Sequence, residues 1–365
     1  MATSMPLMIE GKFWPQVYQK SFRALSSLGL PSAPRGKRTV ELQPCCTVTE
    51  DLSQPCLFIA DRWLNYAFGF REAFWILDGD ASLASIGQYN SRIKQFSDDG
   101  VTMHGAYGPR IFGGVYGKGG SQLWRDQFNT CAVRLKKDRD TRQAVINIWD
   151  NGLDHGDTKD YPCNTQLMFK IRDGRLNMTV IRRSSDIIWG LPYDHLCFTL
   201  VLLAMAGEVG VAPGRLVEFA DSLHYYTDLY EAELKATRLS TEQRAVGFDV
   251  NASGFSVERF REQLRPLIDC EHNVVGKSVV SQGHDHLQDE LPPIVRLGLE
   301  LCYAYLAVKR MEYKSVHTLL RSPSALPLGA HALIPLLRKR AATEEQNHGI
   351  DSDRVNLQRA LSIVL

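Results

Sequence analysis

The sequence predicts an α+β fold with a twisted β-sheet and surrounding helices, followed by an all-α C-terminal extension. Runs of β-type residues alternate with helical patterns up to about residue 230, and mostly helical patterns follow. The length of 365 residues, with 44% hydrophobic and 23% charged residues, is sufficient for a large core. We therefore expect a first domain over residues 1–230 and a helical extension over residues 231–365, packed on that domain or at a dimer interface.

Apolar residues spaced three and four apart predict the helices, and β-type runs predict the strands. The predicted helices cover residues 13–30, 62–77, 127–135, 195–210, 255–268, 294–311 and 330–342. The predicted strands cover residues 144–149, 166–171 and 176–181. Asp173-Gly174 is a typical hairpin turn between the last two strands. Many glycines and aspartates predict a loop over residues 97–120, and Pro213-Gly214 is expected to follow the end of the helix over 195–210.

Composition argues against several classes of protein. A formal net charge of +1 gives no reason to expect direct binding to nucleic acid or to an acidic membrane surface. We find no secretory signal, and the longest apolar run, residues 196–206, is too short to span a bilayer. The eight cysteines include no CxxC pair, which favours reduced thiols over disulfides or a metal site. We expect a cytoplasmic protein without metal.

The segment from Tyr161 to Asp194 carries the chemistry. Cys163 follows a proline, an Arg183-Ser184 pair lies twenty residues later, and Asp194 follows a Gly-Leu-Pro-Tyr turn. A thiol can act as a nucleophile, an arginine with a hydroxyl can hold a phosphate, and a carboxylate can bind the edge of a base. The order predicts a nucleotide site, although a lone cysteine is more often a small buried residue.

These motifs and others, in order along residues 20–235, resemble the thymidylate synthase family. The matching pieces are Lys-Arg-Thr at 37–39, the run from Glu72 to Asp80, Gly-Ala-Tyr-Gly at 105–108, Asp-Thr-Arg at 140–142, Pro-Cys at 162–163, Arg-Ser-Ser-Asp at 183–186, Gly-Leu-Pro-Tyr-Asp at 190–194 and His-Tyr-Tyr at 224–226. The resemblance implies a mixed sheet, a homodimer, a pyrimidine nucleoside monophosphate as substrate, and 5,10-methylenetetrahydrofolate as the co-substrate that gives a one-carbon unit.

The resemblance also implies catalytic roles. Cys163 would add to C6 of the pyrimidine so that C5 becomes nucleophilic. Glu72, on an apolar helix, would transfer protons through ordered water with a raised pKa, although an exposed helix glutamate is the plainer interpretation. Tyr107 lies in a matching motif. Asn164 replaces a histidine of the family's water network near the pyrimidine O4.

Other residues match binding positions of the family. The predicted phosphate ligands are Arg38, Arg183, Ser184, and Arg142 reaching into the partner's site, and Ser185 is a further predicted substrate-binding residue. The predicted sugar ligands are His224 and Tyr226, and the predicted folate ligands are Asp186 and Gly190. Gln143 stands where the family has a second arginine, and Ser222 where it has an aspartate. A solvated surface side chain remains the alternative for each arginine.

Asp194 decides the predicted base. The thymidylate-forming enzymes have asparagine here, whose amide matches N3–H and O4 of uracil, whereas deoxycytidylate hydroxymethylases have aspartate. A carboxylate accepts from the cytosine amino group but cannot donate to O4, so the sequence favours cytosine. The alternative is that Asp194 caps the helix over 195–210.

Three hypotheses follow. The favoured one is a (d)CMP 5-hydroxymethyltransferase, with dCMP preferred to CMP because Ser184 is typical of deoxynucleotide enzymes. Asp194, Asn164 and the altered wall over residues 93–100 support it. The second is a C5-methylase acting on dCMP or dUMP. The third is a non-catalytic nucleotide-binding protein on the same scaffold.

Overall fold

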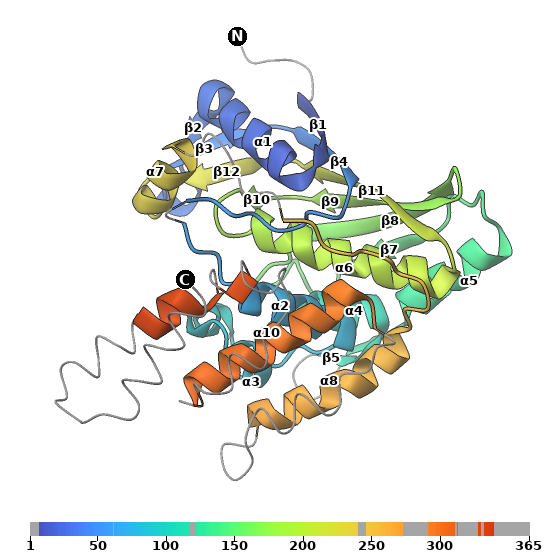
Figure 1. Cartoon of the computed structure of the whole chain (residues 1–365). Coiled ribbons are helices and arrows are strands. Elements are labelled where there is room, and N and C mark those ends of the chain that lie inside the picture. Colours follow the sequence, from blue (N-terminus) through green and yellow to red (C-terminus); the bar gives the residue numbers. More distant parts are fainter. Residues whose placement is uncertain are drawn as a thin grey trace.

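The computed structural model describes residues 7–60, 62–116, 122–239, 246–272, 291–310, 312, 328–329 and 332–338. Its centre is a six-stranded sheet in the order β1-β4-β11-β9-β8-β7 (Figure 1). These strands are β1 (Leu7–Phe13), β4 (Cys45–Asp51), β11 (Ala212–Ala220), β9 (Arg175–Arg182), β8 (Asn164–Arg172) and β7 (Val145–Asn147). β1 and β4 form a parallel pair, and β11 and β9 form another. The other neighbouring strands of this sheet are antiparallel. The predicted α+β fold with a mixed sheet is confirmed.

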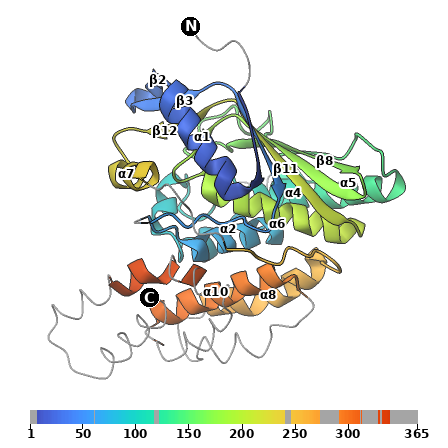
Figure 2. The same cartoon turned by 45° about the horizontal axis from the view of Figure 1, so that its top comes forward.

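Helices are stacked in layers on one face of the sheet. α6 (Leu191–Val209) lies against β9 and β11, and α2 (Tyr66–Asp78) packs on α6. Because α6 is covered by the sheet on one side and by α2 on the other, it is apolar almost all round, as a buried helix must be. α8 (Val257–His272) and α10 (Pro293–Lys309) form a further layer on α2 (Figure 2).

The remaining elements surround this stack. The other helices are α1 (Trp14–Leu28), α3 (Leu83–Ile86), α4 (Tyr107–Phe112), α5 (Gln127–Lys137), α7 (Glu231–Leu239) and the short 3-10 helices at Pro34–Gly36 and Ser91–Phe96. A second sheet has the order β10-β12-β3-β2, formed by β10 (Ser185–Asp186), β12 (Leu223–Tyr226), β3 (Thr39–Leu42) and β2 (Leu30–Ser32). A hairpin is formed by β5 (Gly114–Tyr116) and β6 (Gln122–Trp124). In the described ranges no helix is long and apolar enough to cross a membrane.

Several predicted boundaries hold and others are wrong. Asp173 and Gly174 both have positive φ, 52° and 71°, and form the expected turn between β8 and β9. The predicted loop over 97–120 is wrong in part, because it contains α4 and β5. Pro213 and Gly214 lie inside β11, at a register shift, since α6 already ends at Gly210 with φ 75°.

Two helix starts also differ from the prediction. The helix predicted from residue 62 begins at Tyr66, because the Asn65 side chain accepts a hydrogen bond from the Phe68 N–H at 3.1 Å. α6 begins at Leu191 rather than at residue 195, which puts Asp194 inside its first turn. The alternative of Asp194 as a helix cap is therefore wrong.

Residues 257–272 and 293–309, in α8 and α10, pack directly on α2. A Cβ placed on Gly298 of α10 would lie 2.3 Å from a ring carbon of Phe70, so glycine allows the close approach of α10 to α2. Arg71 of α2 and Glu271 of α8 form a buried ion pair with Nε and Oε1 2.6 Å apart. Of the helix predicted over 330–342, residues 332–338 are helical, and residues 330–331 and 339–342 lie outside the described residues. Residue 311, the last of the helix predicted over 294–311, also lies outside them.

Candidate active site

Cys163 lies immediately before β8, next to the cation that the sequence predicted. Arg183 Nη2 lies 3.7 Å from the Cys163 Sγ, and Arg183 Nε donates to the Pro162 carbonyl at 3.0 Å, which fixes the guanidinium beside the thiol. Burial raises the pKa of Cys163, Arg183 opposes this, and Asp194 and Asp160 add to it. The thiol form is therefore favoured in the free protein, so the cation alone does not create a thiolate.

Glu72 points from α2 toward α6. The Cys197 thiol of α6 donates to its Oε2 at 3.9 Å, a long contact. Burial, and then Asp194 and Asp160, raise the pKa of Glu72 to about 8. Glu72 is accordingly protonated at neutral pH and can supply a proton to a bound molecule.

Asn164, Tyr107 and Asp194 form one hydrogen-bonded group. Asn164 Nδ2 donates to the Tyr107 Oη at 2.8 Å and reaches Asp194 Oδ1 at 3.4 Å. Asn164 is completely buried, whereas the Asp194 side chain is 19% exposed, so Asp194 is the member that can meet a base directly. Burial raises the pKa of Asp194 and Arg182 opposes the rise.

Sequence reasoning missed a buried network behind Asp194. Arg182 Nε donates to Asn164 Oδ1 and Arg182 Nη2 to Glu218 Oε1, each at 2.7 Å. The His195 Nδ1 lies 2.7 Å from the other Glu218 oxygen. A signal existed, because alternation along β9 puts residues 176, 178, 180 and 182 on one buried face, and Arg182 is the charged member of that row.

The predicted phosphate ligands are only partly brought together. Arg183 and Ser184 follow β9, and Arg183 contacts Cys163, while the neighbouring Ser185 is buried in β10. Arg38 is 76% exposed and forms a bidentate pair with Asp228 at 2.7 and 2.8 Å instead of contacting this group. Arg142 is exposed before β7 and forms no hydrogen bond or ion pair with the residues that the structure describes.

The predicted sugar and folate ligands lie on adjacent strands. Asp186 on β10 is the register partner of His224 on β12, whose ring is 5.3 Å from that of Tyr226. The Asp186 Oδ1 accepts the Ile188 N–H at 2.8 Å, and its carbonyl accepts the N–H of Gly190 at 3.0 Å. The turn before α6 thus joins Gly190 to Asp186, which lies beside the predicted sugar ligand His224.

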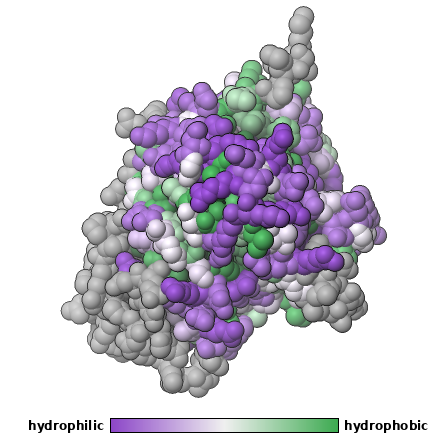
Figure 3. Space-filling model, turned by 90° about the vertical axis from the view of Figure 1, so that its right-hand side faces the viewer, coloured by the Kyte–Doolittle hydropathy of each residue, from purple (hydrophilic) through white to green (hydrophobic). Residues whose placement is uncertain are grey.

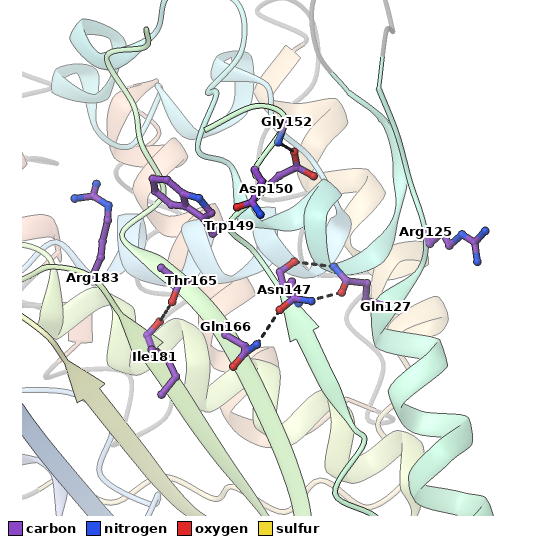
Figure 4. Close-up of a pocket in the computed structure, with 11 residues that line it drawn as sticks. Arg125, Gln127, Asn147, Trp149, Asp150, Gly152, Thr165, Gln166, Ile181 and Arg183 are labelled. Atoms are coloured by element: carbon purple, nitrogen blue, oxygen red, sulfur yellow. Dashed lines mark hydrogen bonds between the residues drawn. The ribbon is translucent and has the colours of Figure 1, made fainter. Parts of the chain in front are cut away.

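A large cavity of about 1050 Å³ opens over β7, β8 and β9. Figure 4 shows Arg183 and Arg125 at opposite sides of it, with Trp149, Asn147 and Gln166 between them. Cys163, Glu72 and Asp194 do not line it, so it adjoins the candidate active site only through Arg183. The face seen in Figure 3 is mainly hydrophilic, with apolar surface gathered near its middle. Within the described ranges, no group of three His, Cys, Asp or Glu side chains is arranged to hold a metal.

Comparison with known proteins agrees with this geometry. The family model of thymidylate synthase matches residues 17–262. Three similar proteins are named deoxyuridylate hydroxymethyltransferase. The one from Bacillus phage SP01 is 35% identical over 259 residues, which are 69% of this chain and 66% of the relative. The one from Pseudomonas phage M6 is 35% identical over 190 residues (51% of this chain, 52% of the relative), and the one from Delftia phage PhiW-14 is 30% identical over 171 residues (42% of this chain, 44% of the relative). The match thus spans 44% to 66% of the length of these relatives. The chain belongs to the thymidylate synthase family.

Proposed function

We propose that the chain transfers a hydroxymethyl group to C5 of dUMP. The reaction consumes dUMP, 5,10-methylenetetrahydrofolate and water and gives 5-hydroxymethyl-dUMP and tetrahydrofolate. The names of the three relatives support this choice of product and base. The observation that carries the proposal is that one chain of contacts joins the three predicted residues. Asn164, which follows Cys163, reaches Asp194 at 3.4 Å, and Glu72 contacts Cys197, three residues after Asp194 on α6, at 3.9 Å.

Each of these residues has a step to perform. The Cys163 sulfur bonds to C6 as its proton leaves, and the C5=C6 electron pair becomes available at C5. Glu72, protonated at neutral pH, donates toward O4 through water and limits the negative charge on the ring. C5 then bonds to the one-carbon unit. As C5 loses its proton, the bond from that carbon to the folate nitrogen breaks, so tetrahydrofolate leaves and an exocyclic methylene remains. Water adds to this methylene, and the sulfur leaves C6 with its bonding electrons.

The base assignment revises the cytosine preference that the sequence favoured. A protonated carboxyl presents one donor and one acceptor, which is the pattern of an asparagine amide and matches O4 and N3–H of uracil. Burial favours this form of Asp194. The positive charge that would oppose it belongs to Arg182, which lies closer to Glu218, at 2.7 Å, than to Asp194, at 3.7 Å.

A second candidate is 5-hydroxymethylation of dCMP. The observation that favours it is the same contact between Arg182 Nε and Asp194 Oδ2, because an ionised Asp194 would accept from the cytosine amino group. CMP is a weaker candidate, since Ser184 keeps the serine of the deoxynucleotide enzymes.

The residues present fit the folate co-substrate, which supplies a one-carbon unit at the oxidation level of formaldehyde. Asp186 is a largely buried carboxylate whose Oδ1 is used by backbone N–H groups, and Trp189 beside it is only partly buried. Such a carboxylate can accept from the N–H groups of a pterin. We further propose a homodimer in which Arg142, unpaired within the described part of the chain, serves the phosphate of the partner's site.

The test gives the purified protein dUMP, dCMP and CMP separately with 5,10-methylenetetrahydrofolate, and identifies the products by mass. We expect 5-hydroxymethyl-dUMP, lost in Cys163→Ala. A methylated product with formation of dihydrofolate would support a methylase instead. Absence of product from all three nucleotides, together with no exchange of the C5 hydrogen, would reject the enzyme and support a binding protein.

A further inference from the structure

A chain of buried ionisable groups crosses three elements directly behind Asp194. Arg182 comes from β9, Glu218 from the neighbouring β11 and His195 from α6, and each residue is at most 2% exposed. The Glu218 carboxylate receives Arg182 on one oxygen and His195 on the other, each at 2.7 Å. The His195 ring in turn stacks on Trp14, with centroids 4.0 Å apart and planes 8° apart.

Such a group is costly to bury, and apolar side chains of similar size often give more stability. Its presence in the row of core residues on β9 therefore needs another reason. The charges are well compensated, because Arg182 and His195 lower the pKa of Glu218 to about 2 despite its burial. Glu218 is an ionised carboxylate at neutral pH.

Arg182 connects this pair to the candidate active site. Its Nε donates to Asn164 Oδ1 at 2.7 Å, which fixes the amide with Nδ2 toward Tyr107 and Asp194. The same Nε lies 3.7 Å from Asp194 Oδ2. The guanidinium thus has one short charged contact, to Glu218, and one long charged contact, to Asp194.

The balance between these two contacts sets how strongly Asp194 is held as an anion. The titratable and charged groups around Asp194 are Arg182 on β9, Glu218 on β11, Glu72 on α2, Tyr107 on α4, Cys197 on α6 and Cys163 before β8. The carboxylate is favoured by the charge of Arg182 and by the hydrogen bond from the Asn164 amide. Glu218 opposes it twice, through its own charge and by pairing with Arg182.

We propose that Glu218 is a specificity-determining residue, which acts through Arg182 to leave Asp194 in its protonated, amide-like form and so selects uracil over cytosine. This inference rests on the proposed function, because it assumes that Asp194 binds the base. Glu218 does not touch the base, and it is a positioning residue.

The decisive variant is Glu218→Gln, which removes the charge but can keep both hydrogen bonds, since the amide oxygen can accept from Arg182 and the NH2 can donate to His195. Arg182 then has Asp194 as its only carboxylate partner among the described residues, and the Asp194 anion is favoured. We expect the ratio of kcat/KM for dUMP to that for dCMP to fall at least tenfold. In the double variant Arg182→Gln/Glu218→Gln the ratio should return to within threefold of the parent.

Two further proteins separate specificity from stability. Glu271→Gln alters the other buried Arg–Glu pair, with Arg71, and should leave the ratio unchanged. Asp194→Asn should keep activity on dUMP within tenfold, and adding Glu218→Gln to it should cause no shift. If Glu218→Gln does not fold, the Asp194→Asn protein can still contradict the inference. Loss of dUMP conversion in that protein would show that Asp194 does not act like an amide.

The outcomes distinguish this inference from the proposed function. A folded Glu218→Gln protein with the parental ratio, or a parent protein that prefers dCMP, would overturn the inference and leave the transferase intact. If the parent converts neither nucleotide, the proposed function fails, and the ratio of dissociation constants for dUMP and dCMP, measured by calorimetry on the same proteins, tests the inference alone.

Discussion

Replacing Glu72 with glutamine is expected to slow the reaction and, at the same time, to stabilise the fold at neutral pH. Burial, Asp194 and Asp160 raise the pKa of Glu72 from 4.5 to about 8. The unfolded chain therefore releases this proton at lower pH than the folded chain. The free energy of unfolding of the parent falls as the pH rises from 4.5 toward 8, and Glu72 adds no slope outside that window.

The size of the effect follows from this window. A single proton gives a slope of about 1.4 kcal/mol per pH unit, so the penalty on the parent reaches about 3 kcal/mol at pH 7. Glutamine cannot ionise, and Glu72→Gln escapes the penalty. The variant should thus exceed the parent in unfolding free energy by a margin that grows with pH, while exchange of the C5 hydrogen of dUMP falls by about 10²–10⁴-fold.

The assay is urea denaturation of both proteins at pH 5, 6, 7 and 8, with equal dependence on urea as the condition for comparing midpoints. Glu258→Gln, which removes an exposed carboxylate from α8, controls for the change in net charge. A difference between Glu72→Gln and the parent that is constant across these pH values would refute the reasoning, because it would mean that Glu72 has the same pKa in both states.

Three other predictions concern the thiol, the proposed dimer and the helical extension. Iodoacetamide should alkylate Cys163 more slowly at pH 7 than a free cysteine in a peptide, because its pKa is raised, and dUMP should protect it; rapid alkylation would contradict the burial argument. The Arg142→Ala and Cys163→Ala proteins are each expected to be inactive. Mixing them should restore about a quarter of the parental activity if subunits exchange and each site takes its arginine from the partner. No recovery after verified exchange would place Arg142 outside the partner's site. Glu271→Ala should lower the free energy of unfolding by about 3–5 kcal/mol, because it leaves Arg71 charged and buried. If urea denaturation shows a loss below about 1 kcal/mol, the pair is not buried in solution.

Local signals in the sequence were sufficient for much of the sheet and the helices. The Asp173-Gly174 turn identifies the β8–β9 hairpin because both residues tolerate positive φ. The Gly-Leu-Pro sequence is typical of a turn and so predicts a helix start at residue 195. α6 begins four residues earlier, because Pro192 fits the first turn of a helix. That shift changes the interpretation of Asp194 from a possible cap to a side chain on the helix surface.

Long-range pairs could not be predicted in the same way. The partner of Arg182 is Glu218, 36 residues later, and their contact depends on β11 lying next to β9. Arg71 and Glu271 are 200 residues apart and meet only because α8 covers α2. Alternation along β9 could have shown that Arg182 is buried, but not which carboxylate neutralises it.

The reaction makes two opposite demands: Glu72 must keep its proton and Cys163 must lose one, although the same charged neighbours act on both groups. Asp160 and Asp194 raise the pKa of both groups. This keeps on Glu72 the proton that the pyrimidine needs, but it also keeps on the sulfur a proton that must leave before C6 is attacked. The two demands are compatible if the transfers are coupled, so that the ring gains a proton as the thiol loses one and negative charge does not accumulate. Asp160→Asn tests this coupling: its amide oxygen can still accept the Gly105 N–H that the carboxylate accepts at 2.8 Å. The variant should alkylate faster at Cys163 and yet exchange the C5 hydrogen of dUMP more slowly above neutral pH, and a change of both rates in the same direction would show that the two protons move independently.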